Sequence, residues 1–200
     1  IPKITETELI ALRSGSISID RDIFSGNVKL PKYNKKINVF DEKKINNLLT
    51  KYNSENIYPK YPESWNYLGK NGFFSFIIPK KYGGTPISIQ EMSNILTKIT
   101  SHNPSLGVSI MVPNSLGPGE LINNYGTHQQ KQKYLPGLAN GNYIPCFGLT
   151  GPQNGSDALG NIDRGIIIEK DNSKKIKINI NKRYITLAPV ANLIGLAFHL

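Results

Sequence analysis

Residues 88–104, SIQEMSNILTKITSHNP, carry the clearest helical pattern in the chain. Ser88 can act as the N-cap, and Asn103-Pro104 stops the helix because proline cannot continue it. Between these ends, apolar side chains recur at the spacing of one helical face: Ile89, Met92, Leu96 and Ile99. We therefore expect an amphipathic helix that packs this face against a core.

Two further helices are predicted upstream. The first follows its N-cap Asp41, and its apolar stripe is Ile45, Leu48, Leu49 and Tyr52. The second follows Pro62 and turns inward Trp65, Leu68 and Phe73. Residues 1–40 show little periodicity and several turn formers, so we expect an extended N-terminal arm there.

Downstream the helical pattern is less regular. The small-residue stretch 105–119 predicts a closely packed helix interrupted by Pro113 and Pro118. Thr127 can cap a polar helix that we expect to end at Leu135-Pro136-Gly137. Together these elements predict an all-α helical domain over residues 41–141.

After residue 141 the periodicity changes to that of strands. Residues 166–168 and 176–180 flank the turn Asp171-Asn172-Ser173, which predicts a hairpin whose second strand alternates in and out. Residues 194–200 alternate as well, and the chain ends inside this strand, so we expect a piece of a longer protein. The predicted fold class is α+β, with the start of an antiparallel β-barrel or sandwich domain over residues 142–200.

The chain is basic, with 24 Lys and Arg against 14 Asp and Glu among 200 residues. A basic chain can bind nucleic acid or an anionic membrane. Here, however, the basic residues are mostly lysines scattered over the whole chain. The densest runs are residues 32–44, which hold only two aromatic side chains, Tyr33 and Phe40, and residues 174–183, which hold none. We therefore do not expect nucleic acid as a partner.

The single cysteine, Cys146, excludes an intramolecular disulfide and a cysteine metal cluster, and it favours a reducing compartment. Its apolar neighbours predict a buried, unreactive thiol. His102, His128 and His199 lie too far apart in sequence to form a local metal-binding pattern. The sequence therefore predicts no metal site.

The segment 149–157, LTGPQNGSD, carries the most chemistry. Gly151 and Gly155 let the backbone approach a ligand closely, and exposed N–H groups in such a loop suit a pyrophosphate. Thr150 and Ser156 add hydroxyl groups. The pattern is neither a Walker loop nor a dinucleotide fingerprint, and it is also ordinary turn chemistry.

Four motifs in a fixed order place this segment in a wider context. They are YPESW to IPKKYGG (61–84), YGTHQQK with YLP (125–136), TGPQNGSD (150–157) and KRYIT (182–186). In this order and spacing they resemble the acyl-CoA dehydrogenase family of flavoproteins. The segments 112–121 and 181–189 are similar to its large bacterial fatty-acid-oxidation branch (FadE type). The resemblance implies that residues 1–200 are truncated before a C-terminal helical domain.

The resemblance implies a site for FAD. Thr150 would lie near the flavin ring, and Ser156 near its phosphates or the acyl-CoA substrate. The cofactor-binding residues implied are Phe147, Leu149, Thr150, Gly155, Ser156, Tyr184, Ile185 and Thr186. Tyr184 and Thr186 would lie against the isoalloxazine, where an aromatic ring excludes water and a hydroxyl or N–H stabilises reduced flavin.

Four positions depart from the family pattern. Gly151 replaces a Glu or Ser, Gln153-Asn154 replaces Gly-Ala or Glu-Ala, and Tyr184 replaces the commoner Trp. The loop therefore keeps its second glycine but gains two larger polar side chains.

The resemblance also implies a reaction. It is the conversion of a medium- or long-chain acyl-CoA to the trans-2-enoyl-CoA, the first step of fatty acid β-oxidation. The implied electron acceptor is an electron-transfer flavoprotein. The implied full-length protein is a homo-oligomer in the bacterial cytoplasm, where segments outside these residues could contact the inner membrane.

The family's catalytic base is a glutamate on the C-terminal domain, beyond Leu200, so we predict no catalytic residue within this chain. We interpret Glu91, Glu120 and Glu169 as solvated or capping carboxylates. Two other interpretations stay open. The chain can be a non-catalytic remnant that acts at most as a binding domain, or part of an oxidase or another flavoprotein relative.

Overall fold

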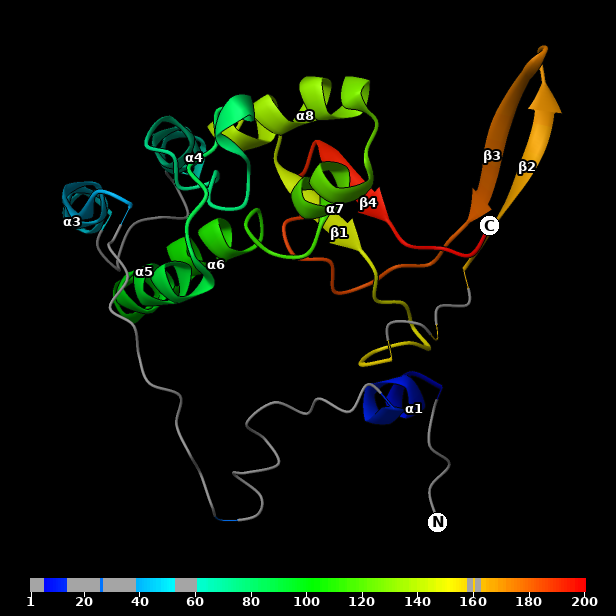
Figure 1. Cartoon of the computed structure of the whole chain (residues 1–200), viewed down its shortest axis with the longest axis horizontal. Coiled ribbons are helices and arrows are strands. Elements are labelled where there is room, and N and C mark those ends of the chain that lie inside the picture. The colour runs from blue at the N-terminus through cyan, green and yellow to red at the C-terminus, as the bar shows by residue number, and fades with distance from the viewer. Residues whose placement is uncertain (1–5, 14–25, 27–38, 53–60, 158–159, 161–162) are drawn as a thin grey trace.

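The computed structural model of the chain describes residues 6–13, 26, 39–52, 61–157, 160 and 163–200. Helices come first and strands last (Figure 1), which confirms the α+β class. The elements are α1 (Glu6–Arg13), α3 (Glu42–Lys51), α4 (Tyr61–Lys70), the 3₁₀ helix η2 (Lys80–Tyr82), α5 (Ile89–His102), α6 (Pro104–Met111), α7 (Pro118–Tyr125), α8 (His128–Asn140), β1 (Pro145–Gly148), β2 (Arg164–Lys170), β3 (Ser173–Asn179) and β4 (Leu193–Leu196).

The N-terminal arm, expected to be extended, contains the helix α1. Glu6 begins this helix and Arg13 ends it, so both charges complement the helix dipole. The eight residues are too few to show a clear helical period in the sequence, which explains why the helix was not predicted. Most of the remaining arm lies outside the described residues.

The main core lies among α3 to α6 and the turns that connect them. Asp41 caps α3 by accepting the Lys43 N–H at 2.9 Å, as predicted. The predicted inward side chains Trp65, Leu68 and Phe73 are buried, although Phe73 follows the end of α4. The Phe73 ring lies 5.0 Å from that of Phe40. Aromatic packing therefore fixes how the N-terminal helices assemble.

Helix α5 begins at Ser88 as predicted, because the Ser88 Oγ accepts the Glu91 N–H at 3.2 Å. The predicted apolar face is wrong in part. Ile95 and Ile99 enter the core, whereas Ile89 is 82% exposed and faces an open groove along α5. The helix carries apolar residues on more than one face, and packing against α6 selects the face of Ile95 and Ile99.

Helix α6 covers the first part of the small-residue stretch and ends before Pro113, as expected. Pro118 does not interrupt a helix as predicted, because it begins α7, which continues to Tyr125. Helix α8 differs from its prediction, since it continues through Pro136 to Asn140. The hydrogen bond that Pro136 cannot donate is outweighed by the burial of neighbouring side chains, Leu135, Leu138 and Ala139. Gly141, with φ at 83°, then ends the helix in the left-handed region.

The described strands form two separate two-stranded sheets. Strands β2 and β3 form the predicted antiparallel hairpin, whose turn places Asp171 and Asn172 both at φ 54°. The predicted in-and-out burial of β3 is wrong, because the hairpin projects from the molecule and every residue of β3 is exposed (Figure 1). Strands β1 and β4 pair in parallel, with Pro145 opposite Leu193.

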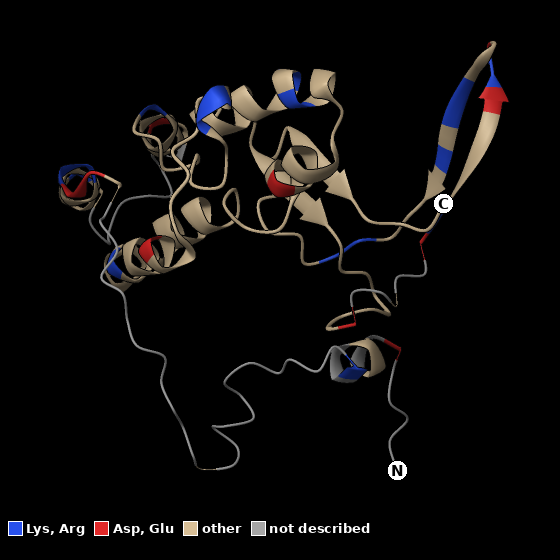
Figure 2. Ribbon diagram, in the orientation of Figure 1, with Lys and Arg blue, Asp and Glu red and all other residues tan. Residues whose placement is uncertain are grey.

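Basic side chains lie on α3, α4, α8 and β3, spread over the molecule (Figure 2). None of the described helices combines the length and the hydrophobicity that crossing a bilayer requires.

Candidate functional site

The loop that follows β1 is closed by the side chain of Asn154. Asn154 is buried, and its Oδ1 accepts the Gly151 N–H at 3.0 Å. Its Nδ2 donates to the Leu149 carbonyl at 3.3 Å. The Gly151 N–H was expected to be available to an anion, but it is bonded within the loop. The loop therefore has a defined shape of its own.

Residues 181–184 lie against this loop, although some thirty residues separate them in sequence. The Arg183 N–H donates to the Thr150 carbonyl at 3.0 Å. The Arg183 Nη2 donates to the Pro152 carbonyl at 2.9 Å, and the Lys182 Nζ donates to the Leu149 carbonyl at 3.0 Å. The structure thus brings together the two segments that were predicted to bind one ligand.

A buried ion pair anchors this contact. The Lys182 Nζ lies 2.5 Å from the Asp163 Oδ2, and the two side chains are 7% and 8% exposed. The Asn181 N–H donates to the Asp163 Oδ1 at 3.0 Å. The hydrogen bond from Lys182 and then that from Asn181 hold the pKa of the Asp163 carboxyl below its ordinary value.

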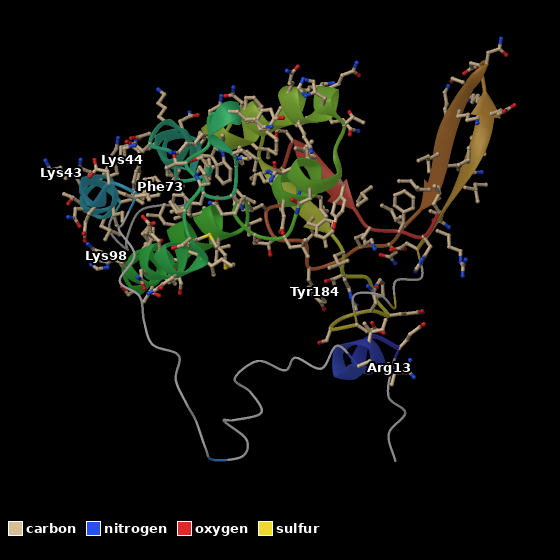
Figure 3. All side chains as sticks on the ribbon, in the orientation of Figure 1. Arg13, Lys43, Lys44, Phe73, Lys98 and Tyr184 are labelled. Atoms are coloured by element: carbon tan, nitrogen blue, oxygen red, sulfur yellow. The ribbon has the colours of Figure 1, made fainter. Side chains whose placement is uncertain are left out.

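Tyr184 stands exposed at the edge of this contact (Figure 3), with 82% of its surface accessible. Its φ of 58° lies in the left-handed region, which a non-glycine residue adopts at a cost of about 1 kcal/mol or more. The Arg183 guanidinium lies 5.1 Å from the centroid of its ring. Strain of this kind persists where surrounding contacts hold it, and it is typical of ligand sites.

The other predicted site residues are distributed around the same two segments. Gly155 and Ser156 are exposed, and a Cβ placed on Gly155 would meet nothing within 4 Å. Thr186 is exposed, whereas Leu149, Thr150 and Ile185 are half-buried. Phe147 faces elsewhere, because its ring packs at Gly195 of β4, where an added Cβ would lie 3.0 Å from it. The Phe147 backbone belongs to β1, and its carbonyl accepts the Leu149 N–H at 3.1 Å.

Sequence reasoning missed three residues that shape the site, namely Asn154, Lys182 and Arg183. Lys182 and Arg183 stood inside a recognised motif without a role, and Asn154 was noted only as a departure. The contacts of Lys182 and Arg183 join segments about thirty residues apart, so no local spacing could reveal them, whereas the contacts of Asn154 lie within the loop itself. The available signal was that each is polar and lies beside a predicted site residue.

Other reactive groups have structural roles. Cys146 is buried, and burial raises the pKa of its thiol, as its apolar neighbours predicted. Glu91 is not solvated as expected, because its Oε1 accepts the N–H groups of Val39 and Phe40 in a buried position. Within the described ranges, no group of three His, Cys, Asp or Glu side chains could hold a metal ion.

The arrangement offers binding groups. Tyr184 supplies a flat aromatic face, and Thr150, Ser156 and Thr186 supply hydroxyl groups. The open position at Gly155 allows a ligand to approach the backbone. These groups suit a ligand with a planar ring system and phosphates.

Comparison with known proteins gives the same family as the motifs. The profile of the family described as "Acyl-CoA dehydrogenase, N-terminal domain" matches residues 32–142. An acyl-CoA dehydrogenase of Bacillus subtilis is 32% identical over 126 residues, which cover 63% of this chain and 32% of that protein. The mitochondrial isovaleryl-CoA dehydrogenase of Pongo abelii is 31% identical over 132 residues, or 66% of this chain and 30% of that protein.

A solved structure shares the fold. The structure of an acyl-CoA dehydrogenase from Bacillus anthracis complexed with FAD superposes with a TM-score of 0.60 at 23% identity, covering 78% of this chain and 26% of that one. The chain spans about a third of the length of the curated relatives it matches. The family profile covers more than half of the residues, and the fold agrees with it, so the chain belongs to the acyl-CoA dehydrogenase family.

Proposed function

We propose that this chain is part of a flavin-dependent acyl-CoA dehydrogenase and supplies one wall of its FAD site. The observation that carries the proposal is the hydrogen bond from the Arg183 N–H to the Thr150 carbonyl. This bond joins the two segments of the site, residues 149–156 and 182–186. The FAD-bound relative from Bacillus anthracis, which has the same fold, supports the choice of cofactor.

The residues present fit FAD. An exposed aromatic ring at Tyr184, open backbone at Gly155 and a hydroxyl at Ser156 match a ring system joined to a pyrophosphate. When bound, FAD accepts a hydride from the substrate at its N5 atom.

This chain's own residues would orient the cofactor. Tyr184 would cover one face of the ring system and exclude water there, with the Arg183 guanidinium 5.1 Å from the centroid of the Tyr184 ring. Thr150 and Thr186 would supply hydroxyl groups as hydrogen-bond donors that stabilise negative charge. Ser156 is exposed at the end of the loop and is proposed to contact the phosphates or the acyl-CoA.

The proposed substrate is an acyl-CoA thioester, and the proposed class is medium- or long-chain. The relatives named isovaleryl-CoA dehydrogenase support a short branched acyl group as the competing class. We also propose an electron-transfer flavoprotein as electron acceptor and a homo-oligomeric full-length protein. The single cysteine supports a cytoplasmic location.

The test uses the full-length protein as its gene encodes it. The purified protein is expected to carry FAD, and anaerobic addition of an acyl-CoA is expected to bleach the visible absorption of the flavin. Comparing palmitoyl-CoA and octanoyl-CoA with isovaleryl-CoA assigns the acyl class. Absence of flavin, or a flavin that none of these thioesters bleaches, would favour the non-catalytic remnant. Rapid reoxidation by air would favour an oxidase.

Tyr184 provides a variant with a matched control. Tyr184→Ala is expected to weaken FAD binding roughly tenfold, since an aromatic contact contributes about 1 kcal/mol beyond its buried area. Tyr184→Trp keeps the aromatic face and is expected to bind FAD normally. Tyr125 is equally exposed, at 83%, but lies on α7, so Tyr125→Ala is expected to change nothing. Equal FAD affinity for both alanine variants would exclude Tyr184 from the site.

A further inference from the structure

The Asn154 side chain lies in the volume that a side chain at residue 151 would need. A Cβ built on Gly151 would lie 2.6 Å from the Asn154 Oδ1, well inside contact distance. Gly151 is not among the glycines with positive φ, which are Gly26, Gly72, Gly83 and Gly141. Its φ therefore does not require glycine, and an added Cβ would meet the Asn154 Oδ1 first and the Asn181 carbonyl oxygen next, at 3.1 Å.

The Asn154 amide forms hydrogen bonds with backbone groups on both sides of Thr150. It bonds to the residue before Thr150 through the Leu149 carbonyl, at 3.3 Å, and to the residue after it through the Gly151 N–H, at 3.0 Å. Both bonds come from one planar, buried group, so the backbone on each side of Thr150 is held in a fixed relation.

Lys182 reinforces the same arrangement from the other segment. Its Nζ donates to the Leu149 carbonyl at 3.0 Å, so this oxygen accepts from both Lys182 and Asn154. The Thr150 carbonyl is taken by the Arg183 N–H. The side chain of Thr150 is thus presented by a backbone whose neighbouring polar groups are satisfied within the protein.

We propose that Asn154 is a positioning residue that pre-organises Thr150 for FAD, and that Gly151 is the space this asparagine requires. The inference rests on the proposed function, because it assumes that the loop binds FAD. It also makes the two departures from the family pattern, at residues 151 and 154, a single coupled change. Pre-organisation of this kind increases affinity because less freedom is lost on binding.

The test is a double-mutant cycle in the full-length protein, with Gly151→Ala, Asn154→Ala and the double variant. The dissociation constant for FAD is measured by quenching of flavin fluorescence. Loss of both Asn154 bonds is expected to weaken FAD binding roughly tenfold. Gly151→Ala displaces the Asn154 amide and is expected to weaken FAD binding by the same factor. The double variant is also expected to bind FAD roughly tenfold more weakly, because a shared interaction is removed only once.

Further measurements separate the possible failures. Thermal unfolding of the flavin-free variants tests whether the loop is coupled without the cofactor, and Gln153→Ala, an exposed neighbour, serves as the loop control. A roughly hundredfold loss in the double variant would mean independent sites and would overturn the coupling. Altered unfolding with unchanged FAD affinity would make Asn154 merely structural. Failure of the unsubstituted protein to bind FAD would overturn the proposed function and this inference with it.

Discussion

At the scale of single residues, the buried carboxylate of Glu91 connects the start of the described core to α5. Its Oε1 accepts the N–H groups of Val39 and Phe40, each at 2.7 Å. Glu91→Ala leaves both donors without this acceptor, so we expect the free energy of unfolding to fall by about 2–4 kcal/mol. Glu91→Gln keeps the acceptor oxygen and is expected to lose about 1 kcal/mol. Urea denaturation measures both, and equal stability of the alanine variant and the unsubstituted protein would contradict this role.

At the scale of elements, the C-terminus of α8 depends on Gly141. Its φ is 83°, and an added Cβ would lie 3.1 Å from the Phe74 ring and 3.3 Å from the Trp65 Nε1. We expect Gly141→Ala to destabilise the protein by about 2–3 kcal/mol, since left-handed strain and close contact act together. Gly83→Ala isolates the strain, because Gly83 has φ 82° but open space, and should cost about 1 kcal/mol. Thermal unfolding compares the two, and equal losses would show that the contact contributes nothing.

At the scale of the whole molecule, apolar burial stabilises the helical part up to Cys146, and polar contacts stabilise the part that follows it. The buried apolar residues of the described ranges end at Cys146, and beyond it Asn154 and Asp163 are the buried polar side chains. Lys182 lowers the pKa of Asp163 below its reference of 3.8, so the pair stabilises the fold above that pH and is lost as pH falls through the folded value. We expect acid to open the hydrogen bonds of the β2–β3 hairpin before those of the helices. Hydrogen exchange followed from about pH 5 to about pH 2 measures this, and Asp163→Asn should abolish the pH dependence of the hairpin. Simultaneous loss of the hairpin and the helices would contradict the expectation.

Local chemistry made much of the helical part predictable. Asp41, Ser88 and Thr127 each cap the helix they were expected to cap, because an N-cap bonds to an N–H two or three residues away. The burial of Ile89 on α5 and the end of α8 were predicted wrongly, whereas Ile99 is buried as predicted and Met92 and Leu96 pack against the core. Both depend on packing against distant residues, and packing overrides local propensity there.

The sequence predicted which two segments form the site, but not the contacts that hold them together. The motifs identified residues 150–157 and 182–186, and the structure joins these segments by hydrogen bonds. The Lys182–Asp163 pair and the packing of the Phe147 ring at Gly195 were not predicted, because each depends on the path of the chain between the motifs. The Asn154 amide was not predicted because its bonds depend on how the loop 149–154 folds back on itself. The coupled change at Gly151 and Asn154 is visible only once the distance between them is known.

The parallel pairing of β1 with β4 has a consequence for synthesis on the ribosome. Ile144, just before β1, donates its N–H to the Oδ1 of Asn192, just before β4 and 48 positions further along the chain. At elongation rates of about 5–20 residues per second, the partner of β1 is made roughly 2–10 s after β1 itself. The helices have been synthesised by then, so β1 can pack against α7 before β4 is available to pair with it. Codons that slow translation between residues 149 and 192 would lengthen that interval and the time for which an unpaired strand edge is open to chaperones.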